Sequence, residues 1–302
     1  LLALQLTDKA AMEVLQARLA LAVDRERVND LFPVEQGAPI MALPEFASFF
    51  DDPPPGGDVE YARHPLLPLP EPGFGGASNA FAASASRSAN NGTLLATDPH
   101  LRLSAPGIWM LARLEFPEGG SIGGTIPGMP VMMLGRSENF GWGLTSAYLD
   151  DQDVFIEQLD PEDPTRVRTP DGFKPMETRA SIIRIKGAAP VTVEMQWTDN
   201  GPVLPGTQFG LAAVTPPGHV ASVGWTLLTG NDRSMSAAMK LMRAQSVTEG
   251  LAAGTDFVAP AQNVIMADRT RIALKTMGAM PRRDAEHMTK GRIPAPGWEV
   301  RN

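Results

Sequence analysis

The sequence predicts an α+β protein in which sheets and helices pack in layers. From residue 78 onward, short apolar or alternating runs separated by Gly, Asn and Pro are typical of strands. A helical pattern follows at 234–254, and a further hairpin pattern follows at 262–278. Strands, then helices, then strands indicate α+β layers. The chain has 302 residues, of which 43% are hydrophobic, so a sizeable core is available.

Charge and composition exclude several classes of protein. The net charge is −8 and the pI about 5.1, which argues against binding to nucleic acid. No run of about 18 apolar residues is present to span a membrane. The absence of cysteine excludes disulfides, thiolate metal sites and a cysteine nucleophile. The chain opens without Met, and we expect it to be an internal piece of a longer protein, so a missing signal peptide carries no information.

The first third of the chain divides into a helix and a proline-rich stretch. Apolar residues at helical spacing predict a helix over 7–31, with the stripe Met12, Leu15, Leu19 and Val23. Residues 33–77 contain "DDPPPGG" and "HPLLPLPEPGFGG", which predict loop or polyproline II and are also typical of an interdomain linker.

The later elements follow from turn residues and periodicity. The stretch 178–197 predicts a hairpin that turns at Lys186-Gly187, and 262–278 predicts another that turns at Asp268-Arg269. The helical stretch 234–254 holds one or two helices, with Ser234 as a cap. The segment "GGSIGGTIPGMP" lacks the nucleotide-binding glycine patterns and predicts a bulge or a close approach of backbones.

Two groups of residues could carry chemistry. Ser78 lies in "PGFGGASNAFAASASRS", between a Gly-rich segment and a strand-like segment, but outside a G-x-S-x-G elbow. His100 is a possible base for it, and a serine, histidine and aspartate triad is one open interpretation. The acidic run "DDQD" places Asp150 and Asp153 three residues apart, which suits Ca²⁺ or, equally, a solvated acidic turn.

A series of motifs in fixed order resembles one known family. The motifs are "SNAF", "LLATDPHL", "GGTIPGMPVMMLGRSENFGWGLTSAYLDDQDVF", "TDNGPVL", "PAQNVIMAD", "GAMPRR" and "PAPGW". This series resembles the penicillin acylase family of N-terminal-nucleophile (Ntn) hydrolases, which includes cephalosporin and acyl-homoserine-lactone acylases. The resemblance runs over the whole chain and implies an Ntn-type αββα sandwich, here as a fragment of a larger precursor. It implies the end of a helical small subunit at 1–45, a spacer at 46–77 and the start of the large subunit at 78–302.

The resemblance implies a role for each site residue. Ser78 would be freed by self-cleavage after Ala77, and its own α-amine would be the general base, since such an amine titrates near 8. His100 would contact the serine or the scissile amide. The backbone N–H of Ser146 and the side chain of Asn263 would form the oxyanion hole. Arg283, or its neighbour Arg282, would position the serine and the asparagine.

The same resemblance implies a metal, a compartment and partners. Asp150, the carbonyl of Gln152 and Asp153 match calcium ligands, so we expect structural Ca²⁺ whose other ligands lie elsewhere in the protein. We further expect a periplasmic or secreted protein, two subunits that stay paired after self-cleavage, a small-molecule amide substrate, and neither nucleic acid nor membrane as a partner. The activity implied is hydrolysis of penicillin-type or acyl-homoserine-lactone-type amides. The alternatives are an uncleaved scaffold or binding module and a conventional serine protease.

Two positions differ from the usual residues of the family, and four residues are candidates for the lining of a substrate pocket. Phe81 stands where the family usually has Trp, and Ala77 stands where Gly is commoner. Candidate pocket residues are Phe81, Met132, Trp142 and Phe155, although ordinary core packing accounts for each of them as well.

Overall fold

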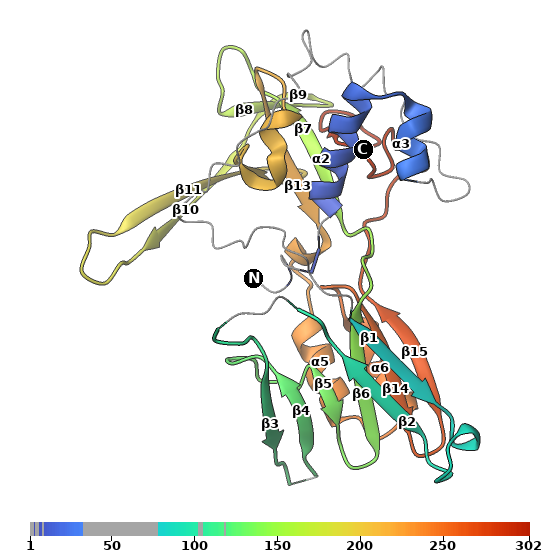
Figure 1. Ribbon diagram of the computed structural model, residues 1–302. Helices are drawn as coiled ribbons and strands as arrows, with labels where there is room; N and C mark the ends of the chain where they lie inside the picture. Colours follow the sequence, from blue (N-terminus) through green and yellow to red (C-terminus); the bar gives the residue numbers. More distant parts are fainter. Residues whose placement is uncertain (1–2, 4–5, 8, 33–77, 102–104, 118) are drawn as a thin grey trace. The chain divides into compact units, whose positions relative to one another are not determined.

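The computed structural model describes residues 3, 6–7, 9–32, 78–101, 105–117 and 119–302 (Figure 1). The expected spacer at 46–77, with the small residues before Ser78, lies outside the described residues. The chain forms two compact units, each built from separated segments: unit 1 is 1–7, 69–149 and 226–280, and unit 2 is 8–68, 150–225 and 281–302. Within the described residues, no helix is long and apolar enough to cross a membrane.

The described residues of unit 1 form a six-stranded antiparallel sheet, a two-stranded hairpin and two α-helices. The large sheet has the strand order β15-β14-β6-β5-β4-β3, and β1 pairs with β2. The α+β prediction is confirmed. The elements are β1 (Asn79–Ala83), β2 (Leu94–Asp98), β3 (Met110–Leu114), β4 (Ser121–Thr125), β5 (Leu134–Arg136), β6 (Phe140–Ser146), α5 (Ser234–Arg243), α6 (Val247–Ala253), β14 (Gln262–Asp268) and β15 (Ile272–Met277).

The two faces of β6 carry different layers. Leu95 and Thr97 of β2 lie directly over Gly141 and Gly143, and a Cβ at Gly143 would come within 2.6 Å of Thr97. The Thr97 hydroxyl accepts a hydrogen bond from the backbone N–H of Leu144 at 3.3 Å. Because β-carbons are missing at these two positions, the hairpin packs closely on the sheet, and this packing fixes β1, which begins directly after Ser78.

The opposite face of the same sheet holds the hydrophobic core of unit 1. Phe140 and Trp142, whose rings stack 5.9 Å apart, pack with residues of α5 and α6. The stretch 234–254, predicted to hold one or two helices, forms two. Ser234 is not the cap: it is the first residue of α5, and its hydroxyl accepts from the backbone N–H groups of Val258 and Ala259. Ser246 caps α6 by accepting from the backbone N–H of Glu249.

The glycine-rich segment before β5 behaves as predicted. Gly123 of β4 and Gly135 of β5 face each other in register. A Cβ on either glycine would collide with the backbone of the other strand. The segment therefore serves a close approach of two strands, and Gly135 has a φ of 155°, a backbone conformation that residues with a side chain rarely adopt.

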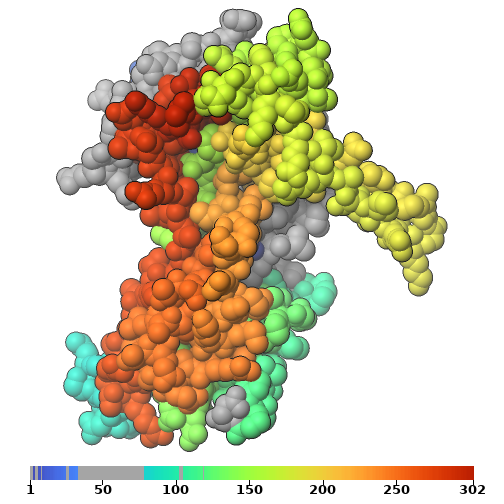
Figure 2. All heavy atoms as spheres, turned by 180° about the vertical axis from the view of Figure 1, so that it is seen from behind, coloured from blue at the N-terminus to red at the C-terminus, as the bar shows by residue number. Residues whose placement is uncertain are grey.

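The described part of unit 2 contains a second six-stranded sheet, a small hairpin and two α-helices. The order of its sheet is β10-β11-β12-β13-β7-β16, and β8 pairs with β9. The elements are α2 (Lys9–Ala22), α3 (Arg25–Leu31), β7 (Gln152–Gln158), β8 (Arg166–Thr169), β9 (Gly172–Pro175), β10 (Glu177–Ile183), β11 (Val191–Thr198), β12 (Gly201–Leu204), β13 (His219–Trp225) and β16 (Ala295–Pro296). The hairpin β10–β11 turns at Lys186-Gly187 as predicted, and all of β10 is exposed, as the yellow arm of Figure 2 shows.

The predicted helix over 7–31 was wrong in two respects. The chain leaves helical geometry at Asp24, which has φ −61° and ψ 147°, so two helices form instead of one. The buried stripe of α2 is Ala10, Glu13, Val14 and Ala17, not the predicted stripe at 12, 15, 19 and 23. Small side chains at positions 10 and 17 let the helix lie close to β7, and the backbone N–H of Ala10 donates to Gln152 Oε1 at 2.9 Å.

The hairpin β14–β15 turns after Asp268, as predicted. The side-chain carboxylate of Asp268 binds backbone groups of both the turn and the first residue of α6. It accepts backbone N–H groups from Val247 at 2.9 Å, Thr270 at 3.0 Å and Arg271 at 2.8 Å. Burial alone would raise the pKa of this group, but these hydrogen bonds prevail and lower it to about 2.

Asp268 therefore makes unit 1 sensitive to acid. A carboxyl whose pKa is lower in the folded state stabilises the fold above the unfolded pKa, near 4, and this contribution is lost as the pH falls toward 2. We expect the free energy of unfolding to fall by about 1–2 kcal/mol more in the wild type than in Asp268→Asn over that range. Urea unfolding at several pH values measures the difference. Asp171→Asn, in an exposed turn, is the matched control and should track the wild type.

Candidate active site

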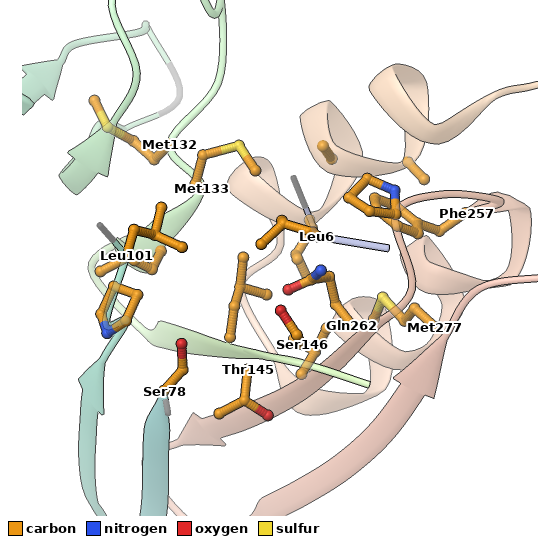
Figure 3. Close-up of a pocket in the computed structure, with 18 of the residues that line it drawn as sticks. Leu6, Ser78, Leu101, Met132, Met133, Thr145, Ser146, Phe257, Gln262 and Met277 are labelled. Carbon is orange, nitrogen blue, oxygen red and sulfur yellow. The ribbon is translucent and has the colours of Figure 1, made fainter. Parts of the chain in front are cut away.

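Ser78 lies at the edge of an apolar pocket in unit 1. The pocket has a volume of about 70 Å³, and its walls are almost entirely aliphatic, methionine and aromatic side chains (Figure 3). Ser78 and Ser146 both line it, and their hydroxyl groups point toward it, whereas the hydroxyl of Thr145 points away. A nucleophile at the mouth of an apolar pocket is an arrangement that can accept the apolar part of an acyl group.

The pocket differs from the expectation in its lining residues. Of the candidates, Met132 lines it. Trp142 is fully buried in the core of unit 1, Phe81 is 63% exposed, and Phe155 belongs to a strand of unit 2. Met133 and Met277 join Met132 in the walls, and flexible thioether side chains adapt readily to ligands of different shape. The sequence alone does not show that these methionines share a pocket, because Met277 lies far along the chain from Met132 and Met133.

Asn263 lies on the face of the sheet that the hairpin β1–β2 covers. It is paired in register with Thr145 of β6, which lies on the same face of β6 as Gly141 and Gly143, beneath β2. Its Nδ2 donates to Thr145 Oγ1 at 3.3 Å, and its Oδ1 accepts from the hydroxyl of Thr276 at 2.8 Å. Ser78 and Ser146 both line the pocket, whereas Asn263 is not among its lining residues and lies on β14, against which β1 packs.

His100 contacts the serine through its backbone. The backbone N–H of His100 donates to Ser78 Oγ at 3.2 Å. The ring Nε2 of His100 lies 2.6 Å from Asp98 Oδ2. His100 thus contacts Ser78 through its backbone and Asp98 through its ring. A catalytic triad would need the ring to contact the serine, and a substitution of His100, described below, tests that interpretation.

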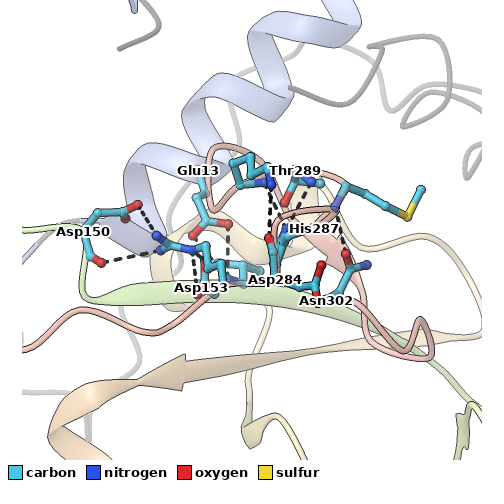
Figure 4. A network of polar contacts seen from close by, with 11 residues as sticks. Glu13, Asp150, Asp153, Asp284, His287, Thr289 and Asn302 are labelled. Atoms are coloured by element: carbon cyan, nitrogen blue, oxygen red, sulfur yellow. Dashed lines mark hydrogen bonds and ion pairs between the residues drawn. The ribbon is translucent and has the colours of Figure 1, made fainter. Parts of the chain in front are cut away.

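Arg283, the fifth expected site residue, belongs to unit 2 and binds the two expected calcium ligands there (Figure 4). Its guanidinium Nε donates to both oxygens of Asp153, at 2.9 and 3.1 Å, and one terminal nitrogen lies 2.8 Å from Asp150 Oδ2. Burial alone would lower the pKa of Arg283, but Asp153 and Asp150 raise it. Arg282, its alternative, is exposed.

A buried carboxylate, Glu13, completes this cluster and was missed in the sequence. It is 1% exposed, and both of its oxygens accept from the backbone N–H of Val154, at 3.1 and 3.3 Å. Burial, and then the charge of Asp153, raise the pKa of Glu13 well above its usual range. Burial also raises the pKa of Asp153 to about 6, although Arg283 acts against it. The available signal was a charged residue between the small and apolar positions 10, 14 and 17 of an otherwise buried helix face.

The carboxylates of this cluster are already paired with a cation. Calcium needs six to eight oxygen ligands, whereas the carboxylates of Asp150 and Asp153 are both bound by Arg283. In the described part of the chain, no three His, Cys, Asp or Glu side chains are grouped to hold a metal. As arranged, the residues fit a guanidinium and not a calcium ion, so no step below depends on calcium.

Comparison with known proteins agrees with this fold. The family model described as penicillin amidase matches residues 1–302, and the chain belongs to this family. Among solved structures it resembles the thermostable penicillin G acylase from Alcaligenes faecalis, with a TM-score of 0.65 and 21% identity over 75% of this chain and 39% of that chain. That likeness shows the shared α+β fold.

Curated relatives carry acylase names. The chain is 32% identical to an acyl-homoserine lactone acylase of Pseudomonas fluorescens (strain Pf0-1), over 74% of this chain and 27% of the relative. It is 27% identical to the penicillin acylase 2 proenzyme of a Pseudomonas species, over 74% of this chain and 28% of the relative. The chain thus spans just over a quarter of the length of these relatives. The names support an amide hydrolase.

The guanidinium of Arg283 binds both Asp150 and Asp153, so its removal should strongly destabilise the fold. Arg283→Met leaves Asp153 and Glu13 buried without this positive charge, and we expect a loss of about 3 kcal/mol in the free energy of unfolding. Chemical denaturation at neutral pH measures it. The neighbouring Arg282→Met removes an exposed guanidinium of the same size and should change the free energy by less than about 0.5 kcal/mol. Equal effects of the two substitutions would contradict the role given to Arg283.

Proposed function

We propose that the protein is the nucleophile-bearing part of an Ntn acylase that hydrolyses amides of apolar acyl groups, with Ser78 as the nucleophile. The observation that carries this proposal is that Ser78 lines an apolar pocket, in a chain that belongs to the penicillin amidase family. Polar groups that could pair with a charged or hydroxylated acyl chain are scarce in the pocket walls. Acyl-homoserine lactones are the first substrate class to test, since the relative from Pseudomonas fluorescens carries that name.

The proposed reaction begins with cleavage of the Ala77–Ser78 bond, which frees the α-amine of Ser78. The amine accepts the proton of Ser78 Oγ while Oγ bonds to the carbonyl carbon of the amide. The negative charge on the tetrahedral intermediate is stabilised by donors of the kind that Ser146 N–H and Asn263 Nδ2 supply. The amine product leaves with the proton, and water then hydrolyses the acyl-Ser78 ester, releasing the carboxylic acid and regenerating Ser78.

Two further proposals follow from the family. We propose a periplasmic or secreted location and two subunits that remain associated after cleavage. Calcium at Asp150, the carbonyl of Gln152 and Asp153 remains a proposal that Arg283 opposes, since the ion would have to displace its guanidinium. Thermal unfolding of the full-length protein distinguishes a calcium-bound cluster from one occupied by Arg283 alone. A bound ion raises the melting temperature with the logarithm of free calcium, whereas a cluster occupied by the arginine gives equal melting temperatures with calcium and with chelator.

The first test of the function removes the nucleophile. Ser78→Ala should abolish both the self-cleavage and the hydrolysis of acyl anilides, because one oxygen performs both reactions. Intact mass of the full-length protein measures the cleavage, and release of the chromogenic amine measures the hydrolysis. A Ser78→Ala protein that still matured into two chains would sink the proposal, and an uncleaved wild type would support the scaffold alternative.

The second test separates an α-amine base from a histidine base. His100 donates to Ser78 through its backbone, which His100→Ala retains, so we expect kcat to fall by less than about tenfold. A triad would lose about 10⁴-fold or more when its histidine is removed. His100→Pro, which lacks the backbone N–H, should be the more damaging of the two substitutions.

A further inference from the structure

Three polar side chains form one row across three adjacent strands of unit 1. Thr145 of β6, Asn263 of β14 and Thr276 of β15 are partners in register. Hydrogen bonds run along the row: Asn263 Nδ2 donates to Thr145 Oγ1 at 3.3 Å, and the hydroxyl of Thr276 donates to Asn263 Oδ1 at 2.8 Å. The amide of Asn263 is therefore held at both ends.

The orientation of this amide decides whether it can act as an oxyanion donor. A side-chain amide presents two donors at one end and an acceptor at the other, and the two ends are nearly equal in shape. In the orientation seen here, Nδ2 faces β6, the strand that ends at Ser146. A rotation by half a turn would direct Oδ1 to that side, and a carbonyl oxygen there would repel an oxyanion.

We propose that Thr276 is a positioning residue that keeps the Asn263 amide in its donor orientation by donating its hydroxyl to Oδ1. The inference rests on the proposed function, because it concerns the oxyanion donor of that reaction. The shorter of the two bonds, 2.8 Å, is the one to Thr276. Nδ2 has two hydrogens and uses one of them for Thr145, so the second remains for the oxyanion.

The substitution that tests it removes the hydroxyl and keeps the shape. Thr276→Val in the full-length protein should lower kcat by about tenfold and leave KM within about twofold, since only a contact that strengthens in the transition state is affected. Thr276→Ser, which retains the hydroxyl, should return kcat to within about twofold of the wild type. Thr192→Val, an exposed threonine of strand β11, is the matched control for the loss of a hydroxyl and should leave both constants unchanged.

A double-mutant cycle shows whether Thr276 acts through Asn263. Asn263→Ala should lower kcat by about 10²-fold or more, as expected for a lost oxyanion donor. If Thr276 works only by orienting that amide, then adding Thr276→Val to Asn263→Ala should cause no further loss. A further tenfold loss in the double variant, or a Ser variant as slow as the Val variant, would overturn the inference.

The failure of the inference can be distinguished from the failure of the proposed function. If Ser78→Ala and Asn263→Ala leave hydrolysis unchanged, the proposed function is wrong and the inference falls with it. If both abolish or strongly reduce hydrolysis while Thr276→Val equals the wild type, only the role of Thr276 is overturned. Melting temperatures of all variants, measured in parallel, show that a lower kcat does not come from unfolding.

Discussion

The packing of β2 on the glycines of β6 is the constraint on which the candidate site depends. Leu95 and Thr97 lie where the side chains of positions 141 and 143 would otherwise be. A larger residue at Gly143 would collide with Thr97, and the hairpin β1–β2 would have to move away from the sheet. Since Ser78 directly precedes β1, such a shift would move Ser78 away from Ser146 and the pocket. The location of the serine is thus set by packing between layers of sheet, and not by a loop.

Much of this fold follows from local sequence patterns, because the hairpin turns are short-range features. Lys186-Gly187 and Asp268-Arg269 were identified from turn residues between apolar runs, and the structure confirms both turns. The buried face of α2 was predicted incorrectly for a physical reason. Helical periodicity favoured the larger apolar side chains, whereas packing against β7 selected the small ones at Ala10 and Ala17. Such a choice depends on the partner strand, which is distant in sequence.

The candidate site was predictable in part, and only through the family. Single residues such as Ser78 and Asn263 have no local pattern that reveals chemistry, and their roles remain predictions. The row through Thr145 and Thr276 could not be predicted, since it needs the register of three strands. Glu13, in contrast to this row, can be recognised in the sequence as a charged residue on a buried helix face once the correct face of α2 is known.

The two units solve the problem of buried polar groups in different ways. In unit 1, Asn263 is neutral, and two hydroxyl groups satisfy its amide at little electrostatic cost. In unit 2, Asp150 and Asp153 bind one guanidinium, and the charge of Lys9 also acts on Asp150, while Glu13 is buried close enough to feel the charges of Asp153 and Arg283. Burial raises the pKa values of Glu13, Asp150 and Asp153, and the charge of Arg283 acts against this rise in each case. A second cation, or protons held by the carboxyls, would balance the charge, and the raised pKa of Glu13 favours a proton on that side chain. The acidic groups of the cluster therefore carry more negative charge than the guanidinium alone can neutralise. This excess is the physical reason to test calcium, even though Arg283 already binds both expected ligands.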